Sequence, residues 1–341
     1  MGCPSILLLP SGAYLASHSH FGPGSTNSDS FIYRSDDGGD SWRRVSHIHG
    51  QIWSKLFWHQ GAVHIIGTDH CDSSGGRLNG RMVIRRSDDD GRTWSAADTA
   101  QTGLLSDEDG YHTAPTAVVV HAGRIWKGFE FAPRLDRRTW RTFVISAPVD
   151  ANLLDRSSWR FSQQLDSWDD YQWIEGNMVT APDGELVNVL RTNDRRHQEG
   201  YGSEQPAAIV HVSADGTALS HDPVADRVAF PGGGTKFTIK RDRASGRYLA
   251  LVNPQEGPDR YRNVLALSAS DDLRRWRVGK EVLRHPDPAA HAFQYVDWDF
   301  DGEDIVFASR TAYDDDAIGA HRAHDANYLT FHRLAQFRRW L

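Results

Sequence analysis

Cysteine is scarce in this sequence, which limits its covalent and metal chemistry. The 341 residues include only two, Cys3 and Cys71. Two cysteines exclude a disulfide scaffold and a zinc site built from four cysteines. One disulfide between them stays open, so cysteine usage does not fix the compartment in which the protein works.

Long apolar segments are missing as well. The longest early run extends from Ile6 to Leu9 and ends at Pro10, which is too short for the core of a signal peptide or for a transmembrane helix. We therefore expect no membrane partner. The sequence as written predicts a cytoplasmic protein, or a secreted or periplasmic one if a leader precedes it.

Neither sign of charge dominates enough to suggest a polyionic partner. The net charge is −7 and the isoelectric point lies near 6.2, so no extended basic face is expected to bind nucleic acid. Aromatic residues are plentiful at 11 %, and tryptophan alone occurs 12 times. Because disordered chains lack aromatic residues, this composition predicts a folded protein.

A short internal repeat punctuates the chain. The segment SDDGGDSW at 35–42 recurs as SDDDGRTW at 87–94, and a shorter copy, SDDLRRW, stands at 270–276. The shared pattern is Ser-x-Asp-x-Gly-x-x-Trp, and each copy follows a β-rich run. The Ser and Asp side chains can bond nearby backbone donors, Gly allows the turn and Trp packs between sheets. We therefore predict that these repeats are structural.

Hairpins recur between the repeats at a spacing of roughly 50–60 residues, and no segment has a sustained helical period. Their turns lie at 10–12, 59–61, 121–123, 182–184, 243–246 and 301–302. Six such modules predict an all-β protein, a β-propeller with four-stranded antiparallel blades, in which a seventh blade stays possible. We expect one domain over 1–341, with blades at about 4–49, 51–105, 111–168, 171–228, 230–289 and 291–338.

The repeat resembles the Asp-box of sialidases and related propellers. Longer segments resemble a sialidase-like group of enzymes that cleave L-rhamnose from glucuronate at glycan ends, by elimination or hydrolysis. This resemblance implies an exo-acting, monomeric enzyme that needs no cofactor and takes an acidic oligosaccharide or polysaccharide. The segments that carry it are 111–130, 173–193, 230–242, 293–315 and 324–333.

One departure from the sialidase pattern stands near the beginning. Sialidases carry an early Phe/Tyr-Arg-Ile-Pro motif with the first of three carboxylate-binding arginines, whereas residues 3–12 here read CPSILLLPSG, without arginine. Simple sialidase activity is therefore in doubt.

Strand direction predicts which residues share one mouth of the ring. The innermost strand of each blade starts at this mouth and the second strand ends there, with the repeat turns at the opposite end. Polar and aromatic residues recur at these positions in all six modules. They are His18, His20, Asp69, His70, Tyr111, His112, Glu130, Trp173, Glu175, Asn177, Arg191, Lys236, Asn253, Gln294, Tyr295, Arg310 and Tyr313, joined by His321, His324, Asp325 and Asn327 of the last long loop.

Chemistry divides these residues into two groups. Histidine suits a general base, carboxylates suit acid–base work on glycosides, and an arginine fork suits a sugar carboxylate. The catalytic candidates are His112, His20, Tyr313, Glu175 and Glu130. The candidate substrate-binding residues are Arg191, Arg310, Lys236, Asp69, Gln294, His324 and Asn327. The cluster of His321, His324 and Asp325 lacks the frame of a metal motif, so we expect no metal.

The first functional hypothesis is a lyase acting on glucuronate that bears L-rhamnose. In it Arg191, Arg310 or Lys236 neutralises the carboxylate. A histidine, His112 or His20, then removes the adjacent proton, and a tyrosine protonates the leaving oxygen; Tyr313 is the residue expected.

Two alternatives remain open. An exo-glycosidase of sialidase type would use Glu175, Glu130 or Asp69 together with Tyr313. A non-catalytic sugar-binding propeller would instead depend on Trp173 at the mouth.

Overall fold

The computed structural model describes residues 1–22, 24–71, 80–132, 140–167, 171–194, 206–254, 261–317, 319–320 and 322–341. Within these ranges the regular structure is β-strand, apart from short 3-10 turns at Arg156–Ser158 and Phe337–Trp340. No helix among the described residues is long and apolar enough to cross a membrane.

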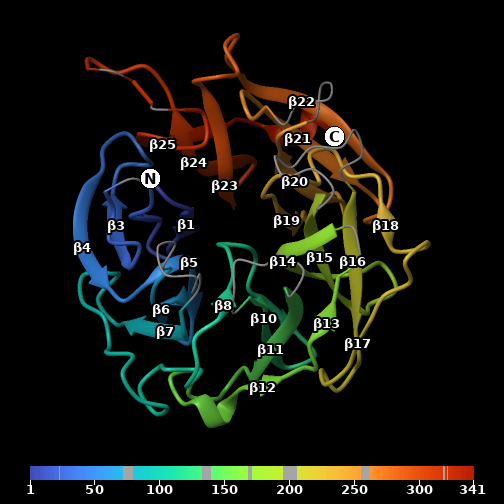
Figure 1. Ribbon diagram of the computed structural model, residues 1–341. Helices are drawn as coiled ribbons and strands as arrows, with labels where there is room; N and C mark the ends of the chain where they lie inside the picture. The colour runs from blue at the N-terminus through green and yellow to red at the C-terminus, as the bar shows by residue number, and fades with distance from the viewer. Residues whose placement is uncertain are drawn as a thin grey trace.

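The strands form six antiparallel sheets arranged around a common centre (Figure 1). Each sheet is a blade, numbered here from the N-terminus. Blade 1 contains β1 (Pro4–Leu8), β2 (Tyr14–Ser19), β3 (Asp29–Ser35) and β4 (Arg43–His49), and blade 2 contains β5 (Ile52–His59), β6 (Ala62–Thr68) and β7 (Met82–Ser87). Blade 3 contains β8 (Tyr111–His112), β9 (Val119–His121), β10 (Arg124–Phe131), β11 (Arg141–Pro148), β12 (Arg160–Phe161) and β13 (Leu165–Asp166).

Blades 4 to 6 continue in the same direction around the ring. Blade 4 contains β14 (Tyr171–Thr180), β15 (Leu186–Asp194), β16 (Ala207–Val212), β17 (Leu219–Ser220) and β18 (Arg227–Val228). Blade 5 contains β19 (Thr238–Arg241), β20 (Tyr248–Val252), β21 (Val264–Ser270) and β22 (Trp276–Arg284), and blade 6 contains β23 (Ala292–Asp301), β24 (Asp304–Ala312) and β25 (Tyr328–Leu334).

This arrangement confirms the six-bladed, all-β propeller, and the described residues hold no seventh sheet. Among the described residues, blades 2 and 6 have three strands rather than the predicted four, and the sheets of blades 3 and 4 contain six and five. In blade 2 the outer position is reduced to a single bridge between Val83 and Leu104. The preceding residues 95–103 read SAADTAQTG, and Ala, Asp and Gly are poor strand formers.

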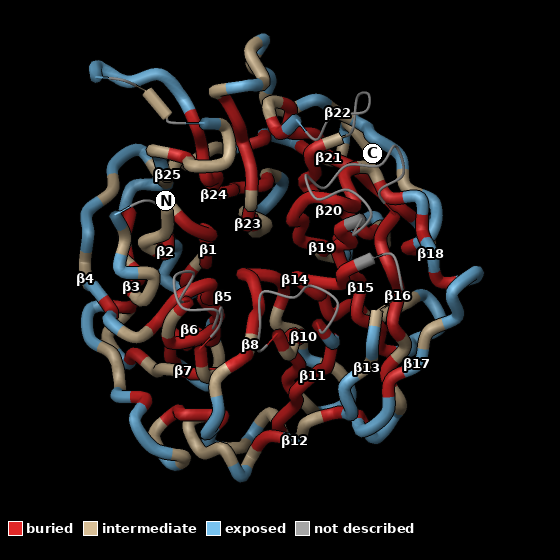
Figure 2. Tube along the Cα trace, in the orientation of Figure 1, coloured by how far each residue is buried: buried red, intermediate tan, exposed pale blue. Residues whose placement is uncertain are grey.

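The innermost strands are buried and the outer strands are exposed (Figure 2). The ring closes where β1 packs against β23: Ser5 Oγ donates to Asp297 at 2.9 Å, and Ile6 N donates to the same carboxylate at 2.8 Å. Among the described residues, no strand of blade 1 joins the sheet of blade 6. Closure therefore depends on side chains at the centre rather than on an exchanged strand.

Register places the repeat turns and the mouth at opposite ends. In blade 1, Pro4 pairs with His18 at the mouth, whereas Tyr14 pairs with Ser35 beside the repeat turn. In that turn Asp37 accepts from Ser35 Oγ at 2.7 Å and from Ser41 N at 2.9 Å. These contacts are those expected of a structural repeat.

Each repeat tryptophan lies at the boundary with the preceding blade. Trp42 packs against Phe331 of blade 6, and Trp94 donates to Ser46 Oγ of blade 1 at 3.1 Å. Trp276 packs against Phe230, within the core cluster between blades 4 and 5. The repeat therefore links neighbouring sheets.

Candidate functional site

Three innermost strands carry the same distortion near the mouth. Trp53, Glu175 and Tyr295 have φ values of 52°, 59° and 54°. Each sits at a shift of register, in β5, β14 and β23 of blades 2, 4 and 6. A left-handed backbone at a residue with a large side chain costs on the order of 1–3 kcal/mol, and bulges re-aim side chains next to active sites. The recurrence in alternate blades marks this end of the ring as the candidate site.

Two of these residues meet at Arg191, which lies in the last part of β15. Arg191 Nη1 lies 2.9 Å from Glu175 Oε2 and 3.3 Å from Tyr295 Oη. Its other nitrogens donate to Gly234 O at 2.9 Å and Asn193 Oδ1 at 3.1 Å. Burial acts to lower the pKa of Arg191, but Glu175 and Tyr295 raise it overall. One fixed cation therefore holds a carboxylate and a phenol side by side.

Two further arginines flank the ring of Tyr295. Arg310 lies 5.0 Å and Arg262 5.2 Å from its centroid. Arg310 is only 2 % exposed, and burial lowers its pKa. It donates to His324 O, while its Nε has no hydrogen-bond partner among the described residues.

Neither flanking arginine has a carboxylate partner in the described part of the chain. Arg262 donates to Gln294 Oε1 instead, and Arg310 contacts the ring of Phe21 at 5.4 Å. A buried charge is costly unless an opposite charge balances it. Because two guanidinium groups lie here around one neutral ring, this part of the mouth is suited to an anion.

A histidine–carboxylate pair stands on the neighbouring blade. His112 Nδ1 lies 2.8 Å from Glu130 Oε2, and Glu130 Oε1 accepts from Gly176 N at 3.2 Å. The imidazole packs against Trp53, with 4.6 Å between centroids, and against Trp140. A carboxylate on Nδ1 orients the ring and leaves Nε2 for proton transfer.

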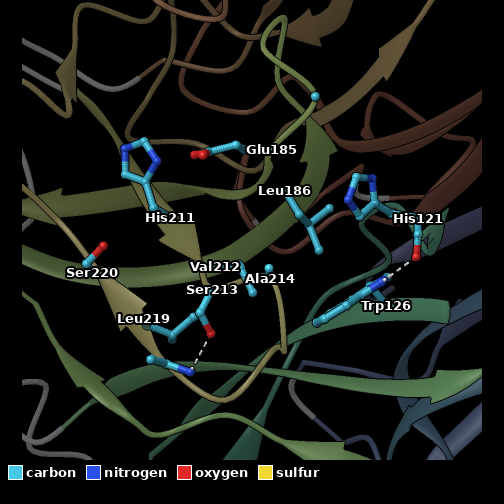
Figure 3. A pocket seen from close by; sticks show the side chains of 12 residues that line it. His121, Trp126, Glu185, Leu186, His211, Val212, Ser213, Ala214, Leu219 and Ser220 are labelled. Atoms are coloured by element: carbon cyan, nitrogen blue, oxygen red, sulfur yellow. Dashed lines mark hydrogen bonds between the residues drawn. The ribbon is translucent and has the colours of Figure 1, made fainter. Parts of the chain in front are cut away.

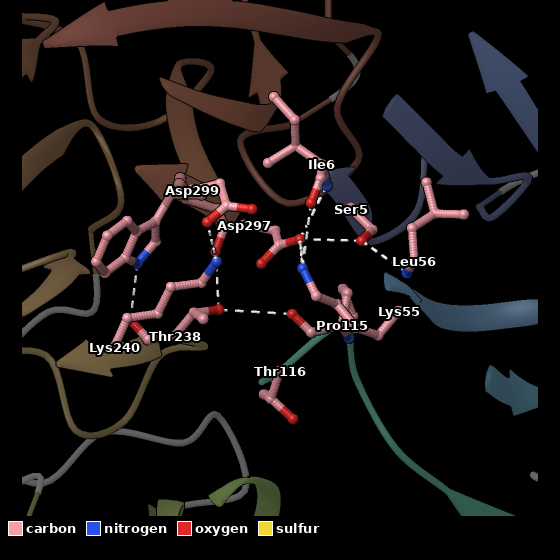
Figure 4. Close-up of polar contacts among 12 residues, drawn as sticks. Ser5, Ile6, Lys55, Leu56, Pro115, Thr116, Thr238, Lys240, Asp297 and Asp299 are labelled. Carbon is pink, nitrogen blue, oxygen red and sulfur yellow. Dashed lines mark hydrogen bonds and ion pairs between the residues drawn. The ribbon is translucent and has the colours of Figure 1, made fainter. Parts of the chain in front are cut away.

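Buried lysines form a polar layer at the centre of the ring (Figure 4). Lys55 binds Asp297 and also donates to Ile6 O at 3.2 Å. Lys236 donates to Thr238 Oγ1 and Val296 O, both at 2.7 Å, and Lys127 donates to Ala114 O at 3.0 Å. Burial lowers the pKa of Lys236 to about 8 and that of Lys127 to about 7.

The buried ammonium of Lys127 predicts a pH dependence of stability. Its pKa in the folded chain lies below the ordinary 10.5, so unfolding takes up a proton between about pH 7 and 10. Stability therefore rises with pH over this window. Relative to Lys127→Met, the wild-type free energy of unfolding should gain roughly 2–3 kcal/mol between pH 7 and 9. Denaturant unfolding of the wild type and of Lys127→Met at both pH values measures this gain. The prediction is contradicted if the free energy of unfolding changes by the same amount in the two proteins.

Not all sequence candidates join the cluster around Tyr295. Gln294 and His324 belong to it through Arg262 and Arg310. Burial lowers the pKa of His324 to about 3, so its imidazole is neutral at pH 7. Lys236 lies in the central layer with its amine already bonded to protein oxygens.

Two candidates at the mouth are engaged within their own blades. His20 packs edge-on against Phe31, with 6.0 Å between centroids. Asp69 accepts from Arg81 Nε at 2.9 Å and contacts His70 Nδ1 at 2.8 Å. Neither side chain has a described contact with Tyr295 or its arginines.

The last long loop holds Tyr313 and Asn327 together. Tyr313 is exposed and packs edge-on against His285 and His291, while Asn327 Nδ2 donates to Tyr313 O at 2.9 Å. No described contact joins Tyr313 to Glu175. Asp325 lies 3.0 Å from His324 Nδ1.

Trp173 is not available at the mouth, contrary to the sugar-binding hypothesis. It is only 1 % exposed and lies in a core cluster with Leu190 and Val210. A buried indole cannot present its face to a sugar ring.

The sequence interpretation missed Arg262 and the shared contact of Tyr295 and Glu175 with Arg191. Arg262 precedes β21, the third strand of blade 5, and third strands also begin at the mouth. The sequence analysis applied the strand-direction rule only to first and second strands. The same rule applied to the starts of third strands identifies Arg262 as a residue at the mouth. No feature of the sequence predicts the bulges at Trp53, Glu175 and Tyr295, because residue type does not reveal where the register of paired strands shifts.

No group of metal-ligating side chains occurs among the residues that the structure describes. His321, part of the cluster considered from the sequence, lies outside those residues. The two cysteines are not joined by a disulfide, and both are buried in the same apolar cluster as Trp53.

Known structures share this fold at low sequence identity. An α-L-arabinanase of Penicillium chrysogenum, in complex with arabinobiose, is 14 % identical over 99 % of this chain and 94 % of its own, with a TM-score of 0.59. An α-L-arabinofuranosidase of Fusarium graminearum is 12 % identical over 99 % and 93 %, with a TM-score of 0.62.

A sialidase of Trypanosoma rangeli, in complex with the inhibitor DANA, is 12 % identical over 97 % of this chain and has a TM-score of 0.59. This chain covers 54 % of that sialidase. No protein-family model matches the sequence, and no curated protein matches it. The protein is therefore a six-bladed β-propeller with the fold that these three enzymes share.

Proposed function

We propose that the protein is an exo-acting carbohydrate-active enzyme that hydrolyses the bond to a terminal acidic sugar. The observation that carries this proposal is the pair of buried arginines, Arg262 and Arg310, without a carboxylate partner in the described chain. A sugar carboxylate supplies the missing charge, and a guanidinium fork matches its geometry.

The reacting groups lie beside this anion site. Tyr295 attacks the anomeric carbon while Glu175 takes the phenolic proton, and Arg191 contacts both groups. Sialidases use a tyrosine nucleophile in the same way. The glycosidic C–O bond breaks as the leaving oxygen takes a proton from His112, which Glu130 orients. Water then releases the sugar from Tyr295 in a second step.

The structural neighbours are consistent with a sugar substrate. One is described in complex with arabinobiose and another, a sialidase, in complex with sialic acid. Sialic acid carries a carboxylate, the group that we propose binds the arginine pair of this chain. From these proteins we infer only that the substrate is a sugar. We infer that this sugar is acidic from Arg262 and Arg310.

A lyase acting at rhamnose-capped glucuronate is a second candidate, which the His112–Glu130 pair favours. A carboxylate-oriented imidazole can remove the proton next to a uronate carboxylate whose charge Arg310 neutralises. Elimination would then break the bond to the leaving sugar without water.

Product masses from a panel of acidic oligosaccharides distinguish these functions. The panel includes a sialoside, a rhamnose-capped glucuronide and neutral arabinobiose. We expect products whose masses sum to substrate plus one water, from an acidic member only. Product masses that sum to the mass of the substrate, together with an unsaturated uronate, would indicate elimination instead of hydrolysis. Binding without any product would overturn both.

A further inference from the structure

Two of the three bulged innermost strands carry reacting groups of the proposed hydrolysis. The bulge in β14 presents Glu175 and the bulge in β23 presents Tyr295, and both side chains contact Arg191. The third bulge, in β5, presents Trp53, to which the proposed hydrolysis gives no role. Because the bulges recur in alternate blades, Trp53 is the counterpart of the base and the nucleophile.

Contacts with blade 1 hold the bulge in β5. Trp53 N donates to Ser19 Oγ at 2.9 Å, so the amide of the bulged residue has a partner outside its own sheet. The indole is buried in an apolar cluster with Cys3 and Cys71, against which Tyr295 also packs. Both the backbone and the ring of Trp53 are therefore fixed in place.

The fixed indole contacts the proposed acid. Trp53 lies edge-on to the imidazole of His112, with 4.6 Å between centroids and 61° between ring planes. Trp140 makes a second ring contact, with 5.0 Å between centroids. His112 belongs to β8, a strand of only two residues, and Glu130 binds its Nδ1. Because one hydrogen bond leaves the imidazole free to turn about the bonded atom, the ring contacts decide where Nε2 points.

We propose that Trp53 is a positioning residue for the leaving-group acid: its indole fixes the plane of His112, so that Nε2 faces the oxygen of the departing sugar. This inference rests on the hydrolysis proposed above. No other described residue forms a hydrogen bond with His112 Nε2. A misplacement of about 1 Å at a reacting group can cost roughly 10²-fold in rate. The third bulge thus serves the acid, as the other two serve the base and the nucleophile.

Leaving-group dependence tests the proposal, because only a poor leaving group needs a proton from the acid. Two substrates share the terminal sugar identified with the panel, and one releases a sugar hydroxyl while the other releases a nitrophenol. Trp53→Leu should lower kcat/KM roughly 10- to 100-fold on the first substrate and about threefold or less on the second. Trp53→Phe keeps an aromatic ring and should recover most of the loss.

Trp126 is the matched control for the loss of a buried indole. It is 2 % exposed and lies at the end of blade 3 opposite His112. There it lines a cavity, and its Nε1 donates to His121 O at 3.1 Å (Figure 3). Trp126→Leu should leave the ratio of kcat/KM between the two substrates as it is in the wild type.

A double-mutant cycle shows whether Trp53 acts through His112. His112→Ala should lose activity on the sugar-releasing substrate selectively, and Trp53→Leu added to it should cause no further loss, since the two changes remove one function. A further loss in the double variant would overturn the proposal. Equal losses on both substrates in Trp53→Leu would overturn it as well.

A measurement without turnover separates this proposal from the proposed function. The proton between His112 Nδ1 and Glu130 should give a resolved downfield NMR resonance in the wild type, which Trp53→Leu broadens and Trp126→Leu preserves. If no acidic substrate is hydrolysed, the proposed function fails, while this resonance still reports whether Trp53 holds His112. An unchanged resonance in Trp53→Leu would overturn the positioning role.

Discussion

Tyr295→Phe and Glu175→Gln are each expected to lower kcat by roughly 10²–10⁴-fold on the acidic substrate found in the panel. The first variant removes the oxygen that attacks the sugar, and the second removes the base that takes its proton. Both keep the shape of the side chain, and glutamine still offers an oxygen to Arg191 Nη1. Steady-state kinetics and single-turnover measurements check the loss.

The matched control for Tyr295→Phe is Tyr313→Phe. Sequence reasoning favoured Tyr313, but its ring packs against His285 and His291 and, unlike Tyr295, has no described contact with Arg191. We expect this control to keep kcat within a few-fold of the wild type. A large loss in Tyr313→Phe together with normal turnover in Tyr295→Phe would contradict the assignment of the nucleophile.

Arg310→Met is expected to raise the melting temperature while it reduces kcat/KM on an acidic substrate. Removing a buried charge that has no carboxylate partner removes its desolvation cost, so the variant should be more stable. Losing a buried charge contact to the substrate costs about 2–5 kcal/mol in transition-state stabilisation, or roughly 30- to 5,000-fold in kcat/KM. Stability and activity thus change in opposite directions, as at other sites strained for function.

Arg191→Met is the matched control for Arg310→Met. Both side chains are buried, but Arg191 is paired with Glu175 at 2.9 Å. Breaking such a pair leaves an uncompensated carboxylate and destabilises the fold by about 3–5 kcal/mol. Thermal unfolding of both variants should therefore give shifts of opposite sign. A fall in melting temperature for Arg310→Met with unchanged kcat/KM would make Arg310 a structural residue.

The difference between these two arginines was not visible from the sequence. Both lie near the end of the second strand of a blade after an apolar run, and both were predicted to bind a carboxylate. Their partners come from other segments of the chain: Glu175 for Arg191, and the carbonyl of His324 for Arg310. Only the folded ring determines which cation is already neutralised.

Some pairings did follow from strand direction. His112 begins an innermost strand and Glu130 lies near the end of the next, so antiparallel pairing sets them opposite each other. Antiparallel pairing also sets Gln294 opposite Arg310. The sequence could not choose Tyr295 over Tyr313, because that choice depends on a bulge in β23 and on a contact that spans 104 residues.

The sequence by itself determined the all-β class, the six blades and the end of the ring where polar residues gather. Turns, alternating strands and the Ser-Asp-Trp repeat are local features, and local geometry fixes their direction. The tertiary structure alone decided which polar residues meet, which arginines lack a carboxylate partner and where bulges turn side chains into the mouth. These features arise from packing between sheets that are distant in the chain, where register, bulges and burial set the charge balance.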